Sequence, residues 1–288
     1  MILGTFLASL LAYLIGSISF SIVFVRFKTG GDVRRHGSNN AGATNASRIL
    51  GKKWGLFIVF LDLVKVVVAA FVALGISAIP HPLFSKTSLF IPALFALIGH
   101  CYPIYYKFKG GKAVSCFIGL ILVANGFYAV IFTIIWWTTI FVFRKISISS
   151  LAATIGVLIL AWVPQISSLS NFSINGDDFI KIYFQDDFVS RQTWMNYFHN
   201  LVNSQGEPFF ESWLMINITV TIGGVILITK HRSNIQRLFK GTEPYYFKYG
   251  QKTKRINVNA DTNQDSKVDQ ADLKQNKKVQ IKKGNSPF

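Results

Sequence analysis

The sequence predicts an all-α polytopic membrane protein with seven transmembrane helices, an external N-terminus and a cytoplasmic C-terminus. The 288 residues are 51% hydrophobic and only 15% charged, with a mean hydropathy of +0.38, which is too apolar for an ordinary soluble domain. Long apolar segments recur along the chain, and Lys and Arg gather in the polar blocks between them. The net charge of +17 suits anionic lipid headgroups or phosphorylated substrates.

Six apolar segments are each long enough to cross about 30 Å of hydrocarbon as a helix. They cover residues 2–25, 54–79, 88–106, 113–143, 146–164 and 213–229. No basic residue precedes the first segment, so we expect a retained helix rather than a cleaved signal peptide. The segment 113–143 has 31 residues and is compatible with one long tilted helix or with a hairpin broken near Asn125 and Gly126.

The distribution of basic residues separates these two topologies. Blocks 26–53, 107–112, 144–145 and 230–255 contain seven, three, two and eight Lys or Arg, whereas 80–87 and 165–212 contain one and two. A hairpin places 20 basic residues on one side against 3, while a single helix gives 12 against 11. Because basic residues accumulate in cytoplasmic loops, we predict the hairpin, and hence seven helices.

Two parts of the chain are expected to lie outside the bundle. Residues 1–255 form the predicted transmembrane domain, and its polar insert 165–212 is expected outside the cell as a small cap without chemistry. Residues 256–288 are rich in Asn, Gln, Asp and Lys, which predicts a disordered cytoplasmic tail. Cys101 and Cys116 lack any metal-ligand spacing, so no metal site, disulfide or cofactor is expected.

The first basic block contains a run of small polar residues. Ser38, Asn40, Thr44 and Asn45 supply short hydrogen-bonding groups, and Arg48 offers a planar fork that matches phosphate. Such a segment can turn its backbone N–H groups toward an anion. The alternative is a polar turn with helix caps.

The second block reads Lys109, Gly110, Gly111, Lys112 and opens directly into an apolar run. Paired glycines before a helix start expose N–H groups at the positive end of the helix dipole, where an anion is stabilised. The spacing of a P-loop is absent. The alternative interpretation is a basic anchor on the cytoplasmic side of the membrane.

The third block follows the last apolar segment. His231 and Asn234 are three residues apart, so on a continuing helix they share one face with Arg237 next along. A single interfacial histidine is more often structural, but three such blocks on one face favour a shared anion-binding site.

Two charged residues interrupt the second apolar segment. Asp62 and Lys65 are three residues apart, and each would be costly in hydrocarbon unless paired. We expect a structural ion pair, with a polar wall of the site as the alternative, and a packed or capping role for His100.

Taken in order, these motifs resemble the bacterial acyl-phosphate:glycerol-3-phosphate acyltransferase family over residues 1 to about 245, apart from the insert. The resemblance implies a seven-helix enzyme of the cell membrane with its active site at the cytoplasmic face. It implies transfer of a fatty acyl group from acyl phosphate to the sn-1 hydroxyl of glycerol 3-phosphate. The products are lysophosphatidic acid and phosphate, in the first step of phospholipid synthesis. Membrane lipids are the other expected partners, nucleic acid is not expected, and the oligomeric state stays open.

The resemblance also assigns residues. It makes Ser38, Arg48, Lys112, His231 and Asn234 catalytic, and it gives substrate binding to Asn40, Thr44, Asn45, Lys109, Gly110 and Gly111. Glu243 would be mainly structural. Asn39 and Ala113 stand where the family usually has glycine; Asn tolerates left-handed angles and Ala113 is expected to be helical already, so we expect a stiffer loop rather than lost activity.

Two other interpretations of the residues remain. A membrane transporter of organic phosphates would also need several spans and basic loops, but it should carry ionisable or broken-helix elements near the midplane. A non-catalytic scaffold for anionic lipids would leave the polar motifs unexplained. None of the five histidines has Asp five residues later, which argues against acyltransferases that use such a pair as general base.

Overall fold

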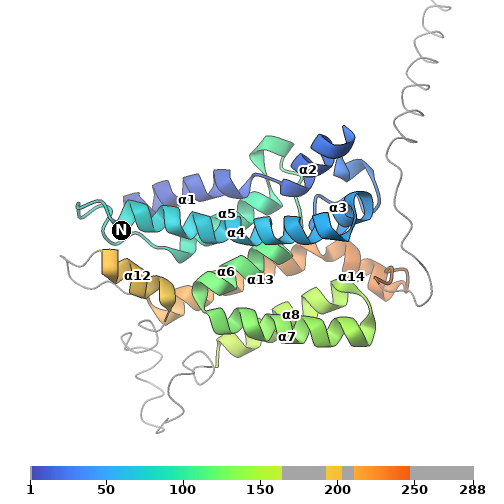
Figure 1. The fold of residues 1–288 in the computed structure, drawn as a ribbon. Helices are drawn as coiled ribbons and strands as arrows, with labels where there is room; N and C mark the ends of the chain where they lie inside the picture. The colour runs from blue at the N-terminus through green and yellow to red at the C-terminus, as the bar shows by residue number, and fades with distance from the viewer. Residues whose placement is uncertain (1, 164–192, 203–210, 247–288) are drawn as a thin grey trace, which may run out of the picture. The chain divides into compact units, whose positions relative to one another are not determined.

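The computed structural model describes residues 2–163, 193–202 and 211–246, and every regular element within these ranges is a helix. The α-helices are α1 (Ile2–Gly16), α2 (Phe20–Thr29), α3 (Ala43–Leu50), α4 (Lys52–Ser77), α5 (Phe90–Cys101), α6 (Val114–Ala124), α7 (Gly126–Phe143), α8 (Ile146–Ala161), α12 (Trp194–Val202), α13 (Trp213–Lys230) and α14 (Arg232–Phe239). Two short 3₁₀ helices, η1 (Val33–Arg35) and η2 (Ile104–Tyr106), lie in the connections. The predicted all-α class is confirmed (Figure 1).

The chain divides into two compact units. Within the described part of the chain, the first contains the residues up to Phe20 and those from Phe57 onward, and the second contains Ser21–Leu56. The first unit therefore carries the second and third motifs, and the second unit carries the first motif. The predicted tail 256–288 and most of the insert, including Asp177, Asp178, Asp186, Asp187 and Glu207, lie outside the described residues.

Within the residues that the structure describes, four stretches are long and apolar enough to cross a membrane: Ile2–Thr29, Lys52–Ser77, Gly126–Phe143 and Trp213–Lys230. Large apolar side chains point outward from them, for example Phe6 at 63%, Ile134 at 60% and Phe141 at 69% exposure. Such surfaces suit hydrocarbon rather than water.

The long segment 113–143 breaks at Asn125, where the hairpin prediction places the break. Asn125 adopts extended angles, and its side chain accepts a hydrogen bond from the N–H of Phe127 at 2.9 Å, which caps the start of α7. The break leaves α6 with 11 residues, a rise of about 16 Å. The segment is therefore two helices, α6 and α7, as the hairpin prediction expects.

The expectation that residues 88–106 form one continuous helix is wrong, because α5 has 12 residues and ends at Cys101. Tyr102 leaves the helical region (φ −133°, ψ 63°) and Pro103 follows, so the helix ends before the apolar segment does. The 3₁₀ helix η2 and the loop to α6 take over from there.

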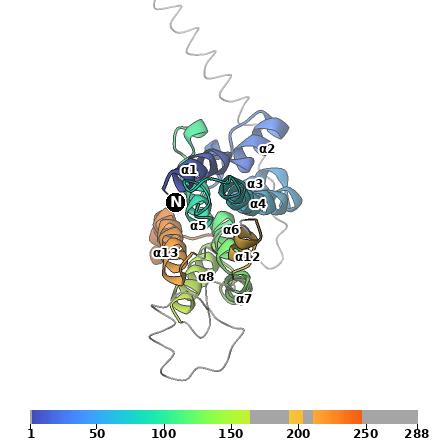
Figure 2. The same ribbon diagram turned by 90° about the vertical axis from the view of Figure 1, so that its left-hand side faces the viewer.

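Close backbone contact joins α1 to α5 in the first unit. A Cβ atom at Gly16 would lie 2.0 Å from the carbonyl oxygen of Ala96, and one at Gly99 would lie 2.3 Å from that of Tyr13. Small residues at such crossings replace hydrophobic attraction as the basis of helix association in lipid. Helices α7 and α8 form a second hairpin, and α13 contacts α5, α6 and α8 (Figures 1 and 2).

A buried carboxyl group lies just before α13. Glu211 is 7% exposed, accepts a hydrogen bond from the Ser88 hydroxyl at 2.7 Å, and has its backbone N–H and C=O paired with the side chain of Asn196 in α12. Among the described residues no Lys or Arg forms an ion pair with it. Burial raises the pKa of Glu211 to about 7, although the hydrogen bonds from Ser88 and from the backbone of Leu89 oppose the shift.

The Glu211→Gln variant should therefore be the more stable protein above pH 7. Because the pKa of Glu211 is raised, its protonated form contributes fully to the free energy of unfolding below pH 4.5, the usual pKa. This contribution is lost as the pH rises through about 7. The loss should approach about 3 kcal/mol. Glutamine keeps the acceptor for Ser88 and does not titrate. Thermal unfolding in detergent at pH 5 and pH 8 checks this; equal pH dependence of both proteins would contradict it.

Candidate functional site

The loop between α5 and α6 is shaped by close contact at Gly110. A Cβ atom at this position would lie 2.1 Å from the carbonyl oxygen of His100, 2.5 Å from Pro103 Cδ and 2.9 Å from the carbonyl oxygen of Cys101. The next residue, Gly111, donates its backbone N–H to the same His100 oxygen at 3.1 Å. Only glycine fits at position 110, so the loop is pressed onto the end of α5.

Three residues of this loop adopt left-handed angles. Lys107, Phe108 and Ala113 have φ values of 56°, 57° and 62°. The expectation that Ala113 is already helical is wrong, because it precedes α6 in a conformation that costs most residues about 1–2 kcal/mol. The chain needs this angle to turn from the loop into the helix, which explains why glycine would be favoured there.

Lys112 joins the second motif to the third. Its ammonium donates to Asn234 Oδ1, and Asn234 Nδ2 donates to Glu243 Oε1 at 2.7 Å and to the Ser147 hydroxyl at 2.8 Å. Ser147 also donates to Glu243 Oε1, while Arg237 Nε donates to Glu243 Oε2 at 2.7 Å. Residues that are far apart along the chain thus form one hydrogen-bonded hub.

Glu243 is the acceptor at the centre of this hub. Partial burial raises the pKa of its carboxyl, but hydrogen bonds from Ser147, Asn234 and Arg237 outweigh it and hold the pKa below the usual value. The carboxylate is therefore charged, and Lys112 and Arg237 leave the hub with a net positive charge. These contacts fit the structural role that the resemblance implies for Glu243.

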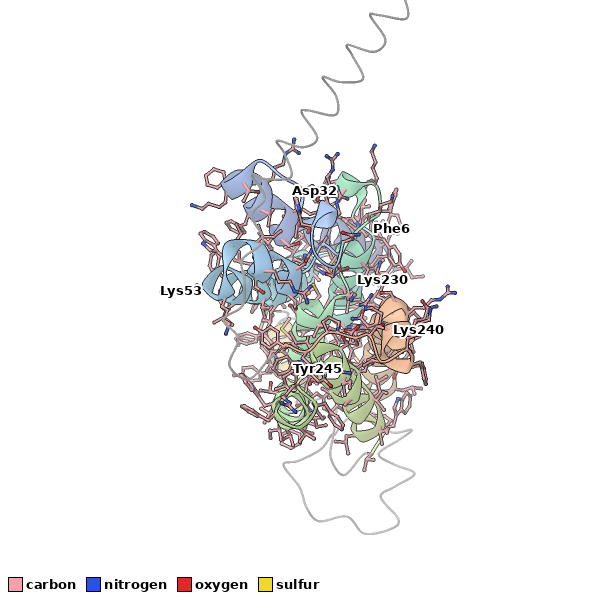
Figure 3. The ribbon with its side chains drawn as sticks, turned by 90° about the vertical axis from the view of Figure 1, so that its right-hand side faces the viewer. Phe6, Asp32, Lys53, Lys230, Lys240 and Tyr245 are labelled. Atoms are coloured by element: carbon pink, nitrogen blue, oxygen red, sulfur yellow. The ribbon has the colours of Figure 1, made fainter. Side chains whose placement is uncertain are left out.

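The segment after α14 folds back onto the turn between α7 and α8. Tyr246 donates its backbone N–H to the carbonyl of Arg144 at 2.8 Å, and Lys145 Nζ lies 4.9 Å from the ring centre of Tyr245. Figure 3 labels Lys230 at the end of α13, Lys240 just after α14 and Tyr245 in the segment that follows. This return of the chain keeps Glu243 beside Ser147.

His231 lies between α13 and α14 and is 3% exposed. Its Nδ1 lies 2.9 Å from the carbonyl oxygen of Leu227, so Nδ1 carries the proton and Nε2 carries the lone pair. Burial lowers the pKa of His231 to about 4, and the charge of Lys112 adds to this effect. The imidazole is therefore neutral at pH 7 and can accept a hydrogen bond from a substrate hydroxyl.

In the second unit, Asn45 folds the first motif around its side chain. Its Nδ2 donates to the carbonyls of Val33 and His36 at 2.8 Å each and of Asn40 at 3.2 Å, and its Oδ1 accepts from the N–H of Ser38 at 3.1 Å. Asn45 is 1% exposed, so it shapes the loop from within.

The outer residues of this motif remain accessible. Ser38 and Thr44 are exposed, and Arg48 in the last turn of α3 is half-buried. Asp32 is the one carboxylate in residues 21–56, and its Oδ2 forms an ion pair with Arg34 Nη2 at 2.6 Å. No carboxylate of that range therefore neutralises Arg48. A guanidinium in this state is suited to a phosphate group.

Asn39 has a φ of 54°, as its tolerance of left-handed angles predicts. Asn39→Gly should leave thermal stability nearly unchanged, whereas Asn39→Val should cost about 1–2 kcal/mol because a β-branched residue is strained there. The side chain of Asn39 is exposed, so a difference in stability between the two variants reports the backbone angle and not a change in packing. Thermal unfolding of the two variants checks this, and equal melting temperatures would contradict it.

Sequence reasoning missed two residues around this site. Ser147 is the second residue of α8. The sequence marks it only by its position, close to Arg144 and Lys145 at the start of an apolar segment. Lys230 donates to the carbonyl of Cys101 at 3.1 Å and lies 4.4 Å from the ring centre of Tyr102, so it ties α13 to the end of α5.

The fold and these contacts define a multi-pass membrane protein whose helix ends carry a buried, net positive, hydrogen-bonded site. The family model described as glycerol-3-phosphate acyltransferase matches residues 6–241. The chain belongs to this family, which confirms the resemblance and the assignment as an enzyme.

Related proteins cover most of the chain. The glycerol-3-phosphate acyltransferases of Mycoplasma mycoides and Mesoplasma florum are 48% and 45% identical, each over 85% of this chain and over 94% and 96% of their own. The corresponding protein of Staphylococcus haemolyticus is 30% identical over 82% of this chain and 94% of its own. A solved structure of PlsY, an integral membrane glycerol 3-phosphate acyltransferase in its glycerol 3-phosphate form, aligns with a TM-score of 0.59 at 27% identity, covering 84% of this chain and 96% of that one. PlsY in its lysophosphatidic acid form aligns with a TM-score of 0.57.

Proposed function

We propose that this chain transfers a fatty acyl group from acyl phosphate to the sn-1 hydroxyl of glycerol 3-phosphate. The observation that carries the proposal is the contact of Lys112 with Asn234, which unites the second and third motifs in one net positive site. The names of the relatives and the glycerol 3-phosphate form of PlsY support the acceptor. The lysophosphatidic acid form of PlsY supports the product.

The residues divide into donor and acceptor groups. The N–H group of Gly110 and the ammonium of Lys112 bind the phosphate of the donor, with Lys109 at the entrance, and Gly111 holds the loop through its hydrogen bond to the His100 carbonyl. His231 and Asn234 hold the acceptor. Ser38 and Arg48 in the second unit, with Asn40 and Thr44 beside them, also bind phosphate, and Asn45 keeps their loop folded.

Acyl phosphate is already activated, so the enzyme needs to orient the two substrates and stabilise charge. The acceptor hydroxyl oxygen attacks the acyl carbonyl carbon, and the bond from that carbon to the phosphate oxygen breaks. The hydroxyl proton passes to the departing phosphate. His231, with its pKa of about 4, is a weak base but a good acceptor, so it orients the hydroxyl through Nε2.

One reconstitution tests this function and its donor. Purified protein given acyl phosphate and glycerol 3-phosphate should form lysophosphatidic acid and free phosphate in equal amounts, and acyl-CoA should not replace the donor. Product from acyl-CoA alone would overturn the donor assignment. Uptake of glycerol 3-phosphate into vesicles without product would instead favour the transporter interpretation.

The proposal includes the topology. Seven membrane crossings are assigned to α1 with α2 and to α4, α5, α6, α7, α8 and α13, with the N-terminus outside and the C-terminus and active site cytoplasmic. The concentration of basic residues after α2, α5, α7 and α13 supports this orientation.

Labelling of single introduced cysteines tests the orientation. An impermeant maleimide should label Lys86→Cys on intact cells and should label Lys240→Cys only after the membrane is opened, since both side chains are exposed. The native Cys101 and Cys116 are buried and give little background. Equal labelling of both positions on intact cells would contradict the topology.

A further inference from the structure

A buried polar cluster in the first unit takes no part in the chemistry proposed above. Asp62 and Lys65 come from α4, His100 from α5 and Cys116 from α6, and none is more than 4% exposed. Lys65 Nζ lies 2.9 Å from Asp62 Oδ1 and 3.0 Å from His100 Nδ1. It also donates to the carbonyl of Ile18 at 2.8 Å. The ion pair expected between Asp62 and Lys65 is confirmed.

The cluster contains its own cation. The ligand atoms of Asp62, His100 and Cys116 lie within 4.8 Å of one another, a spacing that could hold a metal ion. Lys65 Nζ lies within hydrogen-bonding distance of two of these three side chains. Its ammonium balances the carboxylate and leaves no charge for a metal to neutralise, so the cluster is an ion pair with a histidine attached.

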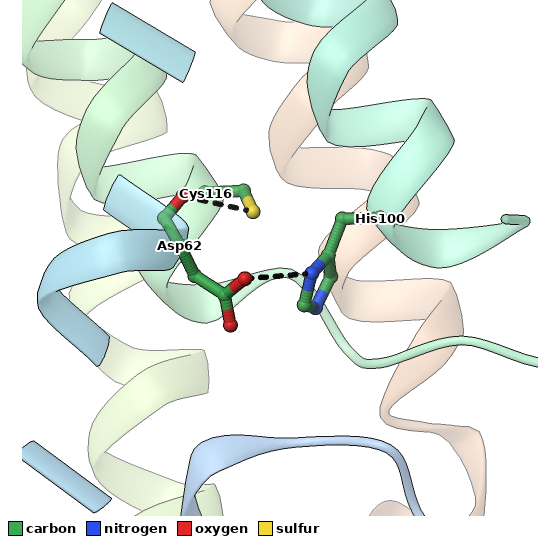
Figure 4. Close-up of side chains that lie close together, drawn as sticks. All are labelled: Asp62, His100 and Cys116. Atoms are coloured by element: carbon green, nitrogen blue, oxygen red, sulfur yellow. Dashed lines mark hydrogen bonds and ion pairs between the residues drawn. The ribbon is translucent and has the colours of Figure 1, made fainter. Parts of the chain in front are cut away.

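Asp62 contacts both ends of the loop that contains Gly110, Gly111 and Lys112. Before the loop, the His100 ring lies 3.5 Å from the Asp62 carboxylate, and after it the Cys116 thiol donates to the Asp62 backbone carbonyl at 3.3 Å (Figure 4). His100 belongs to the last turn of α5 and Cys116 to the first turn of α6. Asp62 of α4 therefore contacts both the end of α5 and the start of α6, which the loop connects.

The backbone of His100 completes the connection. Its carbonyl accepts the N–H of Gly111 at 3.1 Å, and the same oxygen is the nearest obstacle to a side chain at Gly110. The position of His100 therefore sets where the loop rests. A shift of this helix end would move the Gly110 N–H group and Lys112 relative to a bound phosphate.

We propose that Asp62, Lys65 and His100 are positioning residues, which hold the phosphate-binding loop in its binding conformation through the two helix ends that flank it. The inference rests on the proposed function, because it assumes that this loop binds the phosphate of the acyl donor. A loop whose two ends are fixed by buried contacts keeps its donor groups aligned before substrate arrives. Loosening the anchor raises the KM for the molecule held by the loop and affects the other substrate little.

Substitution of His100 tests the anchor. His100→Leu should raise the KM for acyl phosphate by about 10-fold and leave the KM for glycerol 3-phosphate within about 2-fold. His100→Gln places an amide oxygen within reach of Lys65 and should restore most of the donor affinity. A role in folding alone would lower the yield of active protein but would not separate the two KM values.

Cys116 provides a milder variant at the other end of the loop. Cys116→Ala removes the thiol donor and should raise the KM for acyl phosphate slightly, while Cys116→Ser keeps a donor and should restore it. These variants keep the ion pair intact, so they report on the anchor even where His100→Leu fails to fold.

Several outcomes separate the inference from the function it rests on. Both KM values unchanged in all folded variants would overturn the anchor. A rise in the KM for glycerol 3-phosphate alone would support the anchor and overturn the assignment of the loop to the donor. Wild-type protein that is inactive with acyl phosphate would overturn the proposed function. A stoichiometric metal ion that copurifies with wild type and is lost in His100→Leu would overturn the ion-pair arrangement.

Discussion

Lys112→Ala is expected to lower kcat/KM by roughly 30-fold to 1000-fold, which corresponds to about 2 to 4 kcal/mol of transition-state stabilisation. The ammonium lies at the junction of the second and third motifs, where it can neutralise the departing phosphate. Its removal takes away a charge and also leaves Asn234 Oδ1 without its donor. Initial rates of lysophosphatidic acid formation, measured over a range of both substrates, check the prediction.

Two further variants separate charge from hydrogen bonding at this position. Lys112→Gln has an amide that can donate toward Asn234 but carries no charge, so it should remain impaired if the charge matters. Lys86→Ala removes an exposed lysine from the connection between α4 and α5 and should be neutral. Near-normal turnover of Lys112→Ala or Lys112→Gln would contradict the assigned role.

Gly110→Ala should lower activity by about 100-fold, because a displacement of about 1 Å in a positioning element can have an effect of that size. The added Cβ would lie 2.1 Å from the carbonyl oxygen of His100, and backbone of the last turn of α5 cannot yield cheaply. The loop must therefore move, and Lys112 moves with it. Steady-state kinetics of the purified variant check this.

Gly75→Ala is the matched control for this change. Gly75 lies inside α4, and a Cβ atom built there meets nothing within 4 Å. Alanine also has the higher helix propensity, so the variant should be fully active and at least as stable as wild type. Similar losses in both variants would show that the close contact at Gly110 is not the cause.

Much of the site was predictable because its residues carry their chemistry in the local sequence. The glycines and lysines of residues 107–112 indicate an anion-binding loop by their composition and order, and the spacing of His231 and Asn234 indicates a shared face. Ser147 could not be found in this way. Its role depends on α8 lying beside α14 and Glu243, and that contact follows from packing rather than from spacing.

Local backbone angles show the same division. Asn39 could be assigned a left-handed conformation because its side chain is tolerated there. Ala113 was expected to be helical already, yet the turn into α6 imposes a φ of 62° on it. The geometry of the connection overrides the propensity of a single residue.

Sequence alone determined the membrane class, the break at Asn125 and the three polar motifs, because hydropathy, charge and hydrogen-bonding capacity are properties of each segment. Tertiary structure alone decided that Lys112 reaches Asn234, that Glu243 gathers Ser147 and Arg237, and that Asp62 contacts both ends of one loop. These contacts join residues up to 122 positions apart. They depend on how helices pack, which no single segment encodes.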